Sequence, residues 1–243
     1  ADTTVLIENT TAEIALVLDN SGSMSGSKIS SLRSAASLLV DTLYGGVDDN
    51  PNLMFSLVPF TSAVNVGTQN KNASWIDGDG DSPLHSLEFS APTSRFELYD
   101  RITNVSWPGC VEARAYPMDV DDTAPSAANP ETLFVPWFAP DEPDSGTYWN
   151  NYLNDQSGSY DKSVRQKNIG KYMPGVWAGS PSIGSSYGIG PAFLCNSRPI
   201  MPLTNNKTAV KDAISDMDAN GGTNITEGLI WGWRTLSPGE PFT

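Results

Sequence analysis

The sequence has few of the side chains from which most catalytic and zinc sites are built. It holds one histidine and two cysteines in 243 residues, and the cysteines lack the C-x-x-C spacing of a zinc site. The histidine, His85, has no nucleophile turn beside it, so we expect a surface loop residue and not a member of a catalytic triad. We therefore expect no enzymatic activity and assign no catalytic residue.

Basic residues are also scarce. Lysine and arginine together number 14 against 28 aspartates and glutamates, which gives a formal net charge of −14. Such a charge repels phosphate backbones, so we expect no nucleic acid among the partners. We interpret the acidity as a solvated surface that favours solubility.

Long apolar runs are missing as well. No stretch approaches the roughly 18 consecutive apolar residues of a membrane span, and the sequence does not begin with a basic region followed by an apolar one. We expect the chain as given to be soluble. Its hydrophobic content of 39% is enough for a sizeable core in one large domain or in one domain with an elaborate insertion.

The most informative segment is Asp19-Asn20-Ser21-Gly22-Ser23, here named the metal loop, which directly follows an apolar run over residues 14–18. A short continuous apolar run is typical of a buried parallel strand, and ligands of open α/β sheets bind beyond the carboxyl ends of such strands. The carboxylate of Asp19 and the hydroxyls of Ser21 and Ser23 suit a hard divalent cation, Mg²⁺ first, with Ca²⁺ or Mn²⁺ as alternatives. The competing interpretation is an Asx-type turn that caps the following helix.

The small anionic charge of the metal loop has a consequence for binding. An ion held by a single carboxylate stays under-neutralised, so it should accept a further carboxylate at an open position. That carboxylate can belong to another protein. We therefore expect the loop to serve binding rather than a reaction.

A helix and a second strand follow the metal loop. Ser25 or Ser27 is expected to cap the helix, and Gly45-Gly46 to end it. Its apolar stripe consists of Ile29, Leu32, Ala36, Leu39 and Leu43. Residues 53–58 predict the next strand, which Pro59 should stop. The order β, α, β over residues 1–65 predicts the first part of an α/β core.

Between residues 66 and 197 helical periodicity disappears, and we interpret this segment as an insertion. It is rich in proline and in aromatic residues, which give more apolar area than a solvated linker carries, so we expect an ordered, loop-rich lobe. The aromatic residues include Trp75, Trp107, Phe134, Trp137, Phe138, Trp149, Tyr152 and Trp177. Residues 154–190, in which Ser, Gly and Asn dominate, are expected to be its weakest part.

Residues 198–243 predict the return of the core. They begin with a short strand over residues 199–203, followed by a helix that Thr204 or Asn205 should cap. A loop with Gly-Gly-Thr at residues 221–223 separates this helix from a last one. The inner face of the last helix is expected to consist of Leu229, Trp233 and Leu236.

Asp77, Asp79 and Asp81 alternate with glycines, as carboxylates do in calcium loops, and form a second candidate metal site. Counted from Asp77, Glu88 takes the twelfth position, where an EF-hand loop has its bidentate glutamate. Ser82 stands at the sixth position, however, where such a loop needs glycine. The favoured interpretation is therefore a solvated turn.

Cys110 and Cys195 both lie in the irregular middle of the chain. They form either a disulfide or two buried free thiols. An acidic, tryptophan-rich and loop-rich chain is typical of exported proteins, in which disulfides persist, so the bridge is the favoured interpretation.

The metal loop, the helix after it and residues 221–229 together resemble the von Willebrand factor A (vWA) family, whose metal loop is called a metal-ion-dependent adhesion site. The resemblance implies a Rossmann-like open sheet flanked by helices, into which this chain places its long insertion. It implies that Ser21 and Ser23 bind the metal directly, that Asp19 holds it largely through water, and that Thr223 adds a hydroxyl. Taken alone, Thr223 also fits a helix N-cap.

One element of the family is missing from the sequence. The family has an Asp in a T-D-G-like turn after its next core strand, and no such turn follows Thr223 before Thr243. We therefore expect the later strands and helices of the fold either to lie beyond this sequence or to come from a second chain.

Several phrases are similar to bacterial Tad pilus-assembly proteins of the TadG-like type. They are Val58-Pro59-Phe60, residues 107–112, 133–136 and 139–143, and Trp231-Gly232-Trp233-Arg234. This resemblance implies a periplasmic or extracellular protein, membrane-anchored at full length, that binds an acidic residue of a partner through its ion. Pilus components are the implied partners. The alternative is a purely structural component of a pilus complex, in which the ion stabilises the loop.

Overall fold

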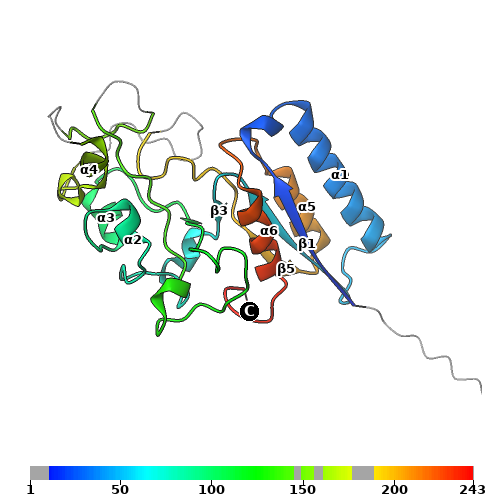
Figure 1. Cartoon of the computed structure of the whole chain (residues 1–243). Coiled ribbons are helices and arrows are strands. Elements are labelled where there is room, and N and C mark those ends of the chain that lie inside the picture. The colour runs from blue at the N-terminus through cyan, green and yellow to red at the C-terminus, as the bar shows by residue number, and fades with distance from the viewer. Residues whose placement is uncertain (1–10, 145–148, 156–160, 177–188, 243) are drawn as a thin grey trace, which may run out of the picture.

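The computed structural model describes residues 11–144, 149–155, 161–176 and 189–242. It is a mixed α/β structure with a five-stranded sheet, which confirms the class expected from the sequence (Figure 1). The strands are β1 (Ala12–Asp19), β2 (Leu53–Phe60), β3 (Val64–Asn65), β4 (Cys110–Val111) and β5 (Met201–Thr204).

The two long strands, β1 and β2, run parallel and in register, from Ala12 opposite Leu53 to Asp19 opposite Phe60. β2 also pairs antiparallel with β3 and with β5, and β3 pairs antiparallel with β4. Within the described ranges β1 pairs with β2 alone, so its other edge is open. Because β1 and β2 are parallel, their carboxyl ends reach the same rim of the sheet.

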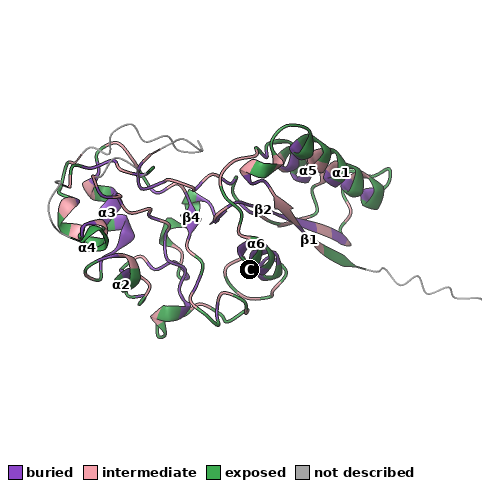
Figure 2. Ribbon diagram, turned by 45° about the horizontal axis from the view of Figure 1, so that its top comes forward, coloured by how far each residue is buried: buried purple, intermediate pink, exposed green. Residues whose placement is uncertain are grey.

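Helices cover both faces of the sheet: α1 (Ser27–Tyr44) and α5 (Lys207–Ser215) lie on one face, and α6 (Ile225–Arg234) lies on the other (Figures 1 and 2). A 3₁₀ turn, η1 (Gly22–Met24), follows β1. The other helices lie between β3 and β5: η2 (Thr68–Asn72), α2 (His85–Glu88), α3 (Arg95–Arg101), η3 (Pro130–Thr132), α4 (Lys162–Lys167) and η4 (Ile169–Lys171). None of the helices in the described part of the chain is long and apolar enough to cross a membrane.

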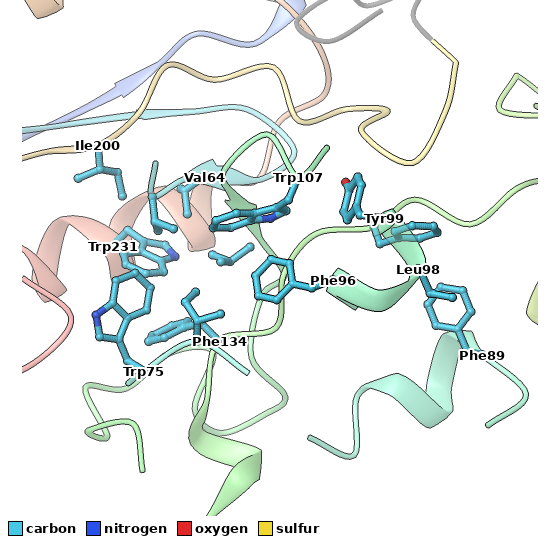
Figure 3. Close-up of a cluster of buried hydrophobic side chains, with 14 of the residues drawn as sticks. Val64, Trp75, Phe89, Phe96, Leu98, Tyr99, Trp107, Phe134, Ile200 and Trp231 are labelled. Atoms are coloured by element: carbon cyan, nitrogen blue, oxygen red, sulfur yellow. The ribbon is translucent and has the colours of Figure 1, made fainter. Parts of the chain in front are cut away.

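Each face of the sheet has its own hydrophobic core. On one face, α1 and α5 cover a cluster that includes Leu16, Phe55 and Leu57. On the other face, α6 and the insertion share one continuous cluster with β2 (Figure 3). Phe134 of the insertion and Trp231 of α6 pack within it, with ring centroids 4.7 Å apart. The insertion is therefore packed onto the core through aromatic side chains.

The insertion leaves the core and returns to it at neighbouring points. The amide of Ile200 donates a 2.7 Å hydrogen bond to the carbonyl of Asn65, at the end of β3. Most of the aromatic residues expected inside are buried, among them Trp75, Trp107, Phe134, Phe138 and Tyr152, whereas Trp149 is 73% exposed. Trp177 lies outside the described residues, as do residues 156–160 and 177–188 of the segment expected to be weakest.

Contrary to expectation, β2 does not stop at Pro59 but runs on to Phe60. The carbonyl of Phe60 accepts a hydrogen bond from the amide of Asn20, so the backbone of Phe60 faces β1. Pro59, one residue earlier, faces the opposite side, where pairing with β5 reaches only as far as Leu57. The missing N–H of the proline therefore removes no hydrogen bond from these two pairings.

The inner face of α6 also differs from the expected one. The three residues predicted to lie inside are exposed to solvent: Leu229, Trp233 and Leu236. The face toward the sheet carries glycines instead. A Cβ on Gly228 would lie 2.4 Å from the ring of Phe60, and one on Gly232 would lie 2.3 Å from Cγ2 of Val17. Because these two glycines have no side chains, α6 can approach the strands closely. The hydrophobic periodicity of the sequence did not predict this close approach.

Two helix starts differ from the predicted caps by one or two residues. The N-cap of α1 is Gly26 rather than Ser25 or Ser27. The N-cap of α5 is Asn206, whose side chain accepts a 2.9 Å hydrogen bond from the amide of Ala209. Asparagine is among the strongest N-cap residues, so the shift follows ordinary capping chemistry.

Candidate metal centre

The metal loop follows directly on β1. Asp19 is the last residue of the strand, and its Oδ1 accepts a 2.8 Å hydrogen bond from the backbone amide of Ser21. The hydroxyl oxygens of Ser21 and Ser23 lie 3.1 Å apart. The structure thus brings these three side chains together in an Asx-type turn. The Asx-type turn of the competing interpretation is therefore formed, but its side chains cap no helix, because η1 has no side-chain cap and the N-cap of α1 is Gly26.

Backbone hydrogen bonds join the metal loop to the turn before Thr223, near the other end of the chain. The carbonyl of Asn20 accepts from the amide of Asn220 at 2.8 Å. The amide of Gly22 donates to the carbonyl of Gly221 at 2.9 Å. The two loops therefore form one structural unit at the carboxyl end of β1.

Thr223 lies in this turn and is exposed. It is not the N-cap of α6, because Asn224 takes that position and its side chain accepts from the amide of Glu227 at 3.2 Å. The amide of Asn224 in turn donates to the carbonyl of Thr61, just beyond β2, at 2.7 Å. Two roles were considered for Thr223, metal ligand and helix N-cap, and Asn224 takes the N-cap position.

The two hydroxyl oxygens of the metal loop, which share a hydrogen bond, also have a spacing that a hard cation accepts. Octahedral Mg²⁺ with ligands at about 2.0–2.1 Å places neighbouring ligand oxygens about 3 Å apart. The hydroxyls of Ser21 and Ser23 are close to that separation, at 3.1 Å. Ser21 is buried, whereas Ser23 and Thr223 are exposed, so an ion held here would face solvent on one side.

The composition of this centre is unusual among metal sites. In the part of the chain that the structure describes, no three or more His, Cys, Asp or Glu side chains gather into a metal-binding group. The candidate centre of the metal loop, with the carboxylate of Asp19 and the hydroxyls of Ser21 and Ser23, is of another kind. Its donor oxygens suit Mg²⁺ or Ca²⁺ better than zinc, which prefers nitrogen and sulfur ligands.

The second candidate site, formed by Asp77, Asp79 and Asp81, is not arranged as a calcium loop. Asp77 is buried, and its carboxylate accepts hydrogen bonds of 2.8 to 3.0 Å from the backbone amides of residues 80–82. It also pairs with Nε2 of His85 at 2.9 Å. Asp79 and Asp81 are exposed. The carboxylate of Asp77 closes a turn, and its oxygens are occupied by the protein's own donors.

His85 is fully buried, so its expected position on the surface was wrong. One ring nitrogen pairs with Asp77, and the other, Nδ1, lies 3.4 Å from Nε of Arg95. Burial acts to raise the pKa of Asp77, but the hydrogen bonds from His85 and from the backbone amides outweigh it and lower the pKa below its usual value. The histidine is a satisfied core residue.

Arg95, which is only 1% exposed, extends this buried network. Its guanidinium nitrogens lie 2.9 Å from Glu88 and 3.0 Å from Glu112. Burial raises the pKa of Glu112 to about 7, against the opposing charge of Arg95. Sequence analysis missed this network, because its members are spread over residues 77–112 with no motif that links them.

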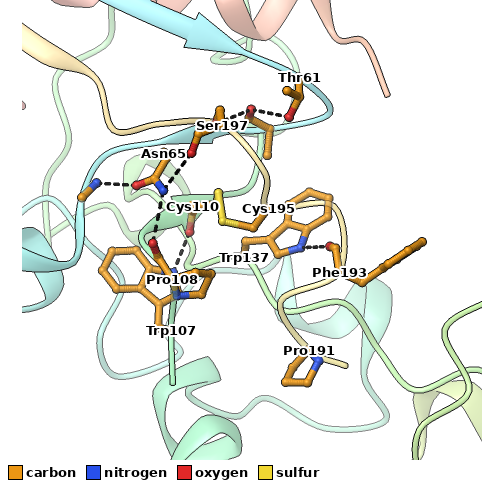
Figure 4. Close-up of a disulfide and its surroundings, with 12 residues drawn as sticks. Thr61, Asn65, Trp107, Pro108, Cys110, Trp137, Pro191, Phe193, Cys195 and Ser197 are labelled. Carbon is orange, nitrogen blue, oxygen red and sulfur yellow. Dashed lines mark hydrogen bonds between the residues drawn. A yellow bond between two sulfur atoms is a disulfide. The ribbon is translucent and has the colours of Figure 1, made fainter. Parts of the chain in front are cut away.

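The expected disulfide between Cys110 and Cys195 is formed, with Cα atoms 5.8 Å apart (Figure 4). Two tryptophans flank it. The indole of Trp107 donates to the carbonyl of Cys110 at 2.6 Å, and the indole of Trp137 donates to the carbonyl of Phe193 at 2.8 Å. The bridge ties the last part of the insertion to β4.

The predicted site residues thus fall into two groups. Asp19 accepts from the amide of Ser21, the hydroxyls of Ser21 and Ser23 are in contact, and backbone hydrogen bonds join the metal loop to the turn that carries Thr223. The acidic residues of the second candidate site do not converge on a shared point. Comparisons with protein-family models, with curated proteins and with solved structures found no match for this chain.

Proposed function

We propose that this chain is a metal-ion-dependent protein-binding module of the vWA type, in an adhesion or assembly role. The supporting observation is the hydrogen-bonded pairing of two distant loops at the carboxyl end of β1, which gathers Asp19, Ser21 and Ser23 beside the turn of Thr223. Mg²⁺ is the favoured ion, with Ca²⁺ and Mn²⁺ as alternatives. The chain offers one negative charge to a divalent ion, and a carboxylate of the partner supplies the second.

The surroundings of the metal loop favour an acidic partner residue. The ammonium group of Lys28 donates a 3.1 Å hydrogen bond to the carbonyl of Ser23 and is exposed. Its positive charge adds to that of the ion, so a carboxylate is attracted and a basic side chain is repelled. The net charge of −14 repels an acidic partner elsewhere on the protein, which confines its docking to this region.

We further propose a place in bacterial pilus assembly or on the cell surface, on the basis of the TadG-like phrases. The Cys110–Cys195 disulfide is consistent with a periplasmic or extracellular location, where disulfides persist. The partners would then be pilus components, and the full-length protein would be anchored in the membrane.

A second chain that completes the fold is part of the same proposal. One edge of β1 is open within the described residues, so the backbone groups on that edge have no partner strand there. An added strand beside β1 would satisfy them. Leu229 and Trp233 of α6 are 60% and 58% exposed and give a second chain apolar surface to cover.

A purely structural role is the second candidate function. The two loops are already bonded to each other, so an ion between them would also stiffen the rim of the sheet. Chelation would then lower the melting temperature without changing which partner is bound.

The test uses as probe the tripeptide Gly-Asp-Gly, acetylated and amidated, so that its one charge is the aspartate. We expect it to bind wild-type protein in Mg²⁺ but not in EDTA, and not to bind the Asp19→Ala variant. Asp79→Ala, which removes an exposed aspartate outside the metal loop, is the matched control and should bind as wild type does. Equal affinity in Mg²⁺, in EDTA and in Asp19→Ala would reject the proposal. A lower melting temperature in EDTA than in Mg²⁺, with no binding of the tripeptide in either condition, would favour the structural role.

A further inference from the structure

A polar cavity of about 460 Å³ lies beside the turn that leads to Thr223. Its walls come from both the core and the insertion: Asn65 of β3, Pro108, the segment 195–199 after the disulfide, and Asp218 with Asn220. Figure 4 shows Asn65, Pro108 and Ser197 around the disulfide that holds these walls together. The volume lies within the range of pockets that hold small ligands.

Asn196, which lines the cavity, has a side-chain amide that none of the described residues satisfies. Both Oδ1 and Nδ2 of Asn196 are buried and have no hydrogen-bond partner among the described residues. Asn65, by contrast, is fully used: its Nδ2 donates to the carbonyls of Pro108 and Ser197 at 3.2 Å, and its Oδ1 accepts from the amide of Gly67 at 2.8 Å. A buried amide without partners is costly, so a group from outside the chain is the expected complement.

The side chain of Asn196 lies directly against the second loop of the candidate metal centre. A Cβ on Gly221 would come within 2.9 Å of Nδ2 of Asn196, and Gly221 has a φ of +75°. Glycine is therefore required at position 221 both for its backbone conformation and for the close approach of the amide. From Asn220 at the cavity wall to Thr223 the chain takes three steps, which span at most about 10 Å at 3.3–3.6 Å per residue.

We infer that this cavity receives the main-chain peptide groups of the partner residues next to the carboxylate that binds the ion. The inference rests on the proposed function and specifies that the chain binds the partner's backbone as well as its carboxylate. A side-chain amide offers one acceptor and donors on the same plane, so it complements the N–H and C=O of a peptide group. An extended segment of about three residues reaches from the cavity to the ion.

The chemistry of the rim agrees with an uncharged peptide segment. Arg198 and Asp218 at the rim lie 3.5 Å from each other, so their opposite charges offset one another and select no charged ligand. Among the described residues that line the cavity there is no aromatic ring, which leaves no stacking surface for a sugar or a base. Amides and backbone carbonyls are the groups that remain.

The inference is tested with two probes in Mg²⁺, sodium acetate and the acetylated, amidated tripeptide Gly-Asp-Gly. Both offer one carboxylate, and only the tripeptide offers peptide groups. In ¹⁵N-labelled wild-type protein, we expect both probes to shift the amide signals of Ser21 and Ser23, and only the tripeptide to shift the side-chain amide of Asn196. Each hydrogen bond that the tripeptide makes to the buried amide of Asn196 should raise its affinity several-fold, and acetate makes none of them. The tripeptide should therefore bind about tenfold more tightly than acetate.

The variant Asn196→Ala should reduce the affinity for the tripeptide to that for acetate and leave the affinity for acetate unchanged. Asn205→Ala, at an exposed asparagine outside the cavity, is the matched control and should keep the difference between the probes. Equal binding of both probes by wild type, with no shift at Asn196, overturns the inference and leaves the proposed function standing. Failure of both probes to bind in Mg²⁺ overturns the two together. The wild-type signals decide the matter even if Asn196→Ala does not fold.

Discussion

The amide of Gly22 and the carbonyl of Gly221 share a 2.9 Å hydrogen bond, which ties the loop at the end of β1 to a turn formed by the last part of the chain. Together with the bond from the amide of Asn220 to the carbonyl of Asn20, and the bond from the amide of Asn224 to the carbonyl of Thr61, it fixes the turn that carries Thr223 relative to the metal loop. The geometry of the candidate centre is therefore set by the tertiary fold and not by the metal loop alone.

Removal of the Asp19 carboxylate is expected to abolish stabilisation by Mg²⁺. A ligand at 100 times its dissociation constant stabilises the folded state by about 2.7 kcal/mol, so wild type should show a clear rise in melting temperature when Mg²⁺ is added. Asp19→Ala should show none, and Asp79→Ala should show the full rise. The opposite pattern would place the ion at the acidic turn of residues 77–81. Differential scanning fluorimetry in Mg²⁺ and in EDTA measures the rise in melting temperature for each variant.

A methyl group at Gly228 is expected to destabilise the protein. Its Cβ would lie 2.4 Å from the ring of Phe60, and neither the helix nor the strand can move freely in a packed core. Overpacking of this kind costs about 1–3 kcal/mol, so Gly228→Ala should lower the free energy of unfolding by that amount. Gly46→Ala, where an added Cβ meets nothing within 4 Å, is the control. Equal urea midpoints for the two variants would contradict the close packing of α6 on the sheet.

Loss of the disulfide should be costly, because it closes a loop with a sequence separation of 85 residues. The chain-entropy treatment gives about 4 to 5 kcal/mol for a loop of this length, before any native strain is subtracted. The double variant Cys110→Ser/Cys195→Ser should unfold at a lower urea concentration than wild type. Wild type measured under reducing conditions should approach the variant, and a variant as stable as oxidised wild type would show that the bridge constrains little.

The stability of the protein should fall as the pH rises from about 4.5 to about 7, through the titration of Glu112. Burial raises the pKa of this carboxyl from 4.5 to about 7 in the folded state, so the folded protein holds the proton more tightly than the unfolded chain does. The contribution is complete below the unfolded pKa and is lost as the pH passes the folded pKa.

Replacement of the carboxyl by an amide isolates this effect. Between pH 5 and pH 7.5, wild type should lose about 2–3 kcal/mol of unfolding free energy relative to Glu112→Gln, whose side chain does not titrate. Glu97→Gln, at a glutamate that is 66% exposed, is the control and should follow wild type. Parallel pH profiles for wild type and Glu112→Gln would show that Glu112 is ionised throughout.

Local patterns predicted the part of the site that is local. Asp19, Ser21 and Ser23 lie within five residues at the end of one strand, so the contacts among them follow from the position of that strand and the turn after it. The apolar stripe of α1 was predicted only in part: Ile29 and Ala36 are buried, whereas Leu39 and Leu43 are 42% and 43% exposed. The helix buries Val40 and Tyr44 in their place. The spacing of residues along the sequence is enough to predict which side chains are neighbours where a single strand and its turn position all of them.

The remainder depends on contacts between distant segments. His85 is buried because Asp77 and Arg95 enclose it, and nothing in its immediate neighbours indicates that. α6 is apolar on more than one side, so its period did not decide which side faces the sheet; the glycines at 228 and 232 decided it by allowing close approach. Such choices are made by tertiary packing, which single-sequence patterns do not encode.

The hydrogen bond between Ile200 and Asn65 has a consequence for how this protein can diverge. Since the long excursion departs and rejoins at adjacent positions, its exposed loops can change in length and composition while the spacing of β3 and β5 stays the same. Its buried aromatic side chains, which share one cluster with β2 and α6, are instead constrained by the sheet. Variation in those loops would alter the surface of the protein without displacing the strand end that carries the candidate metal centre.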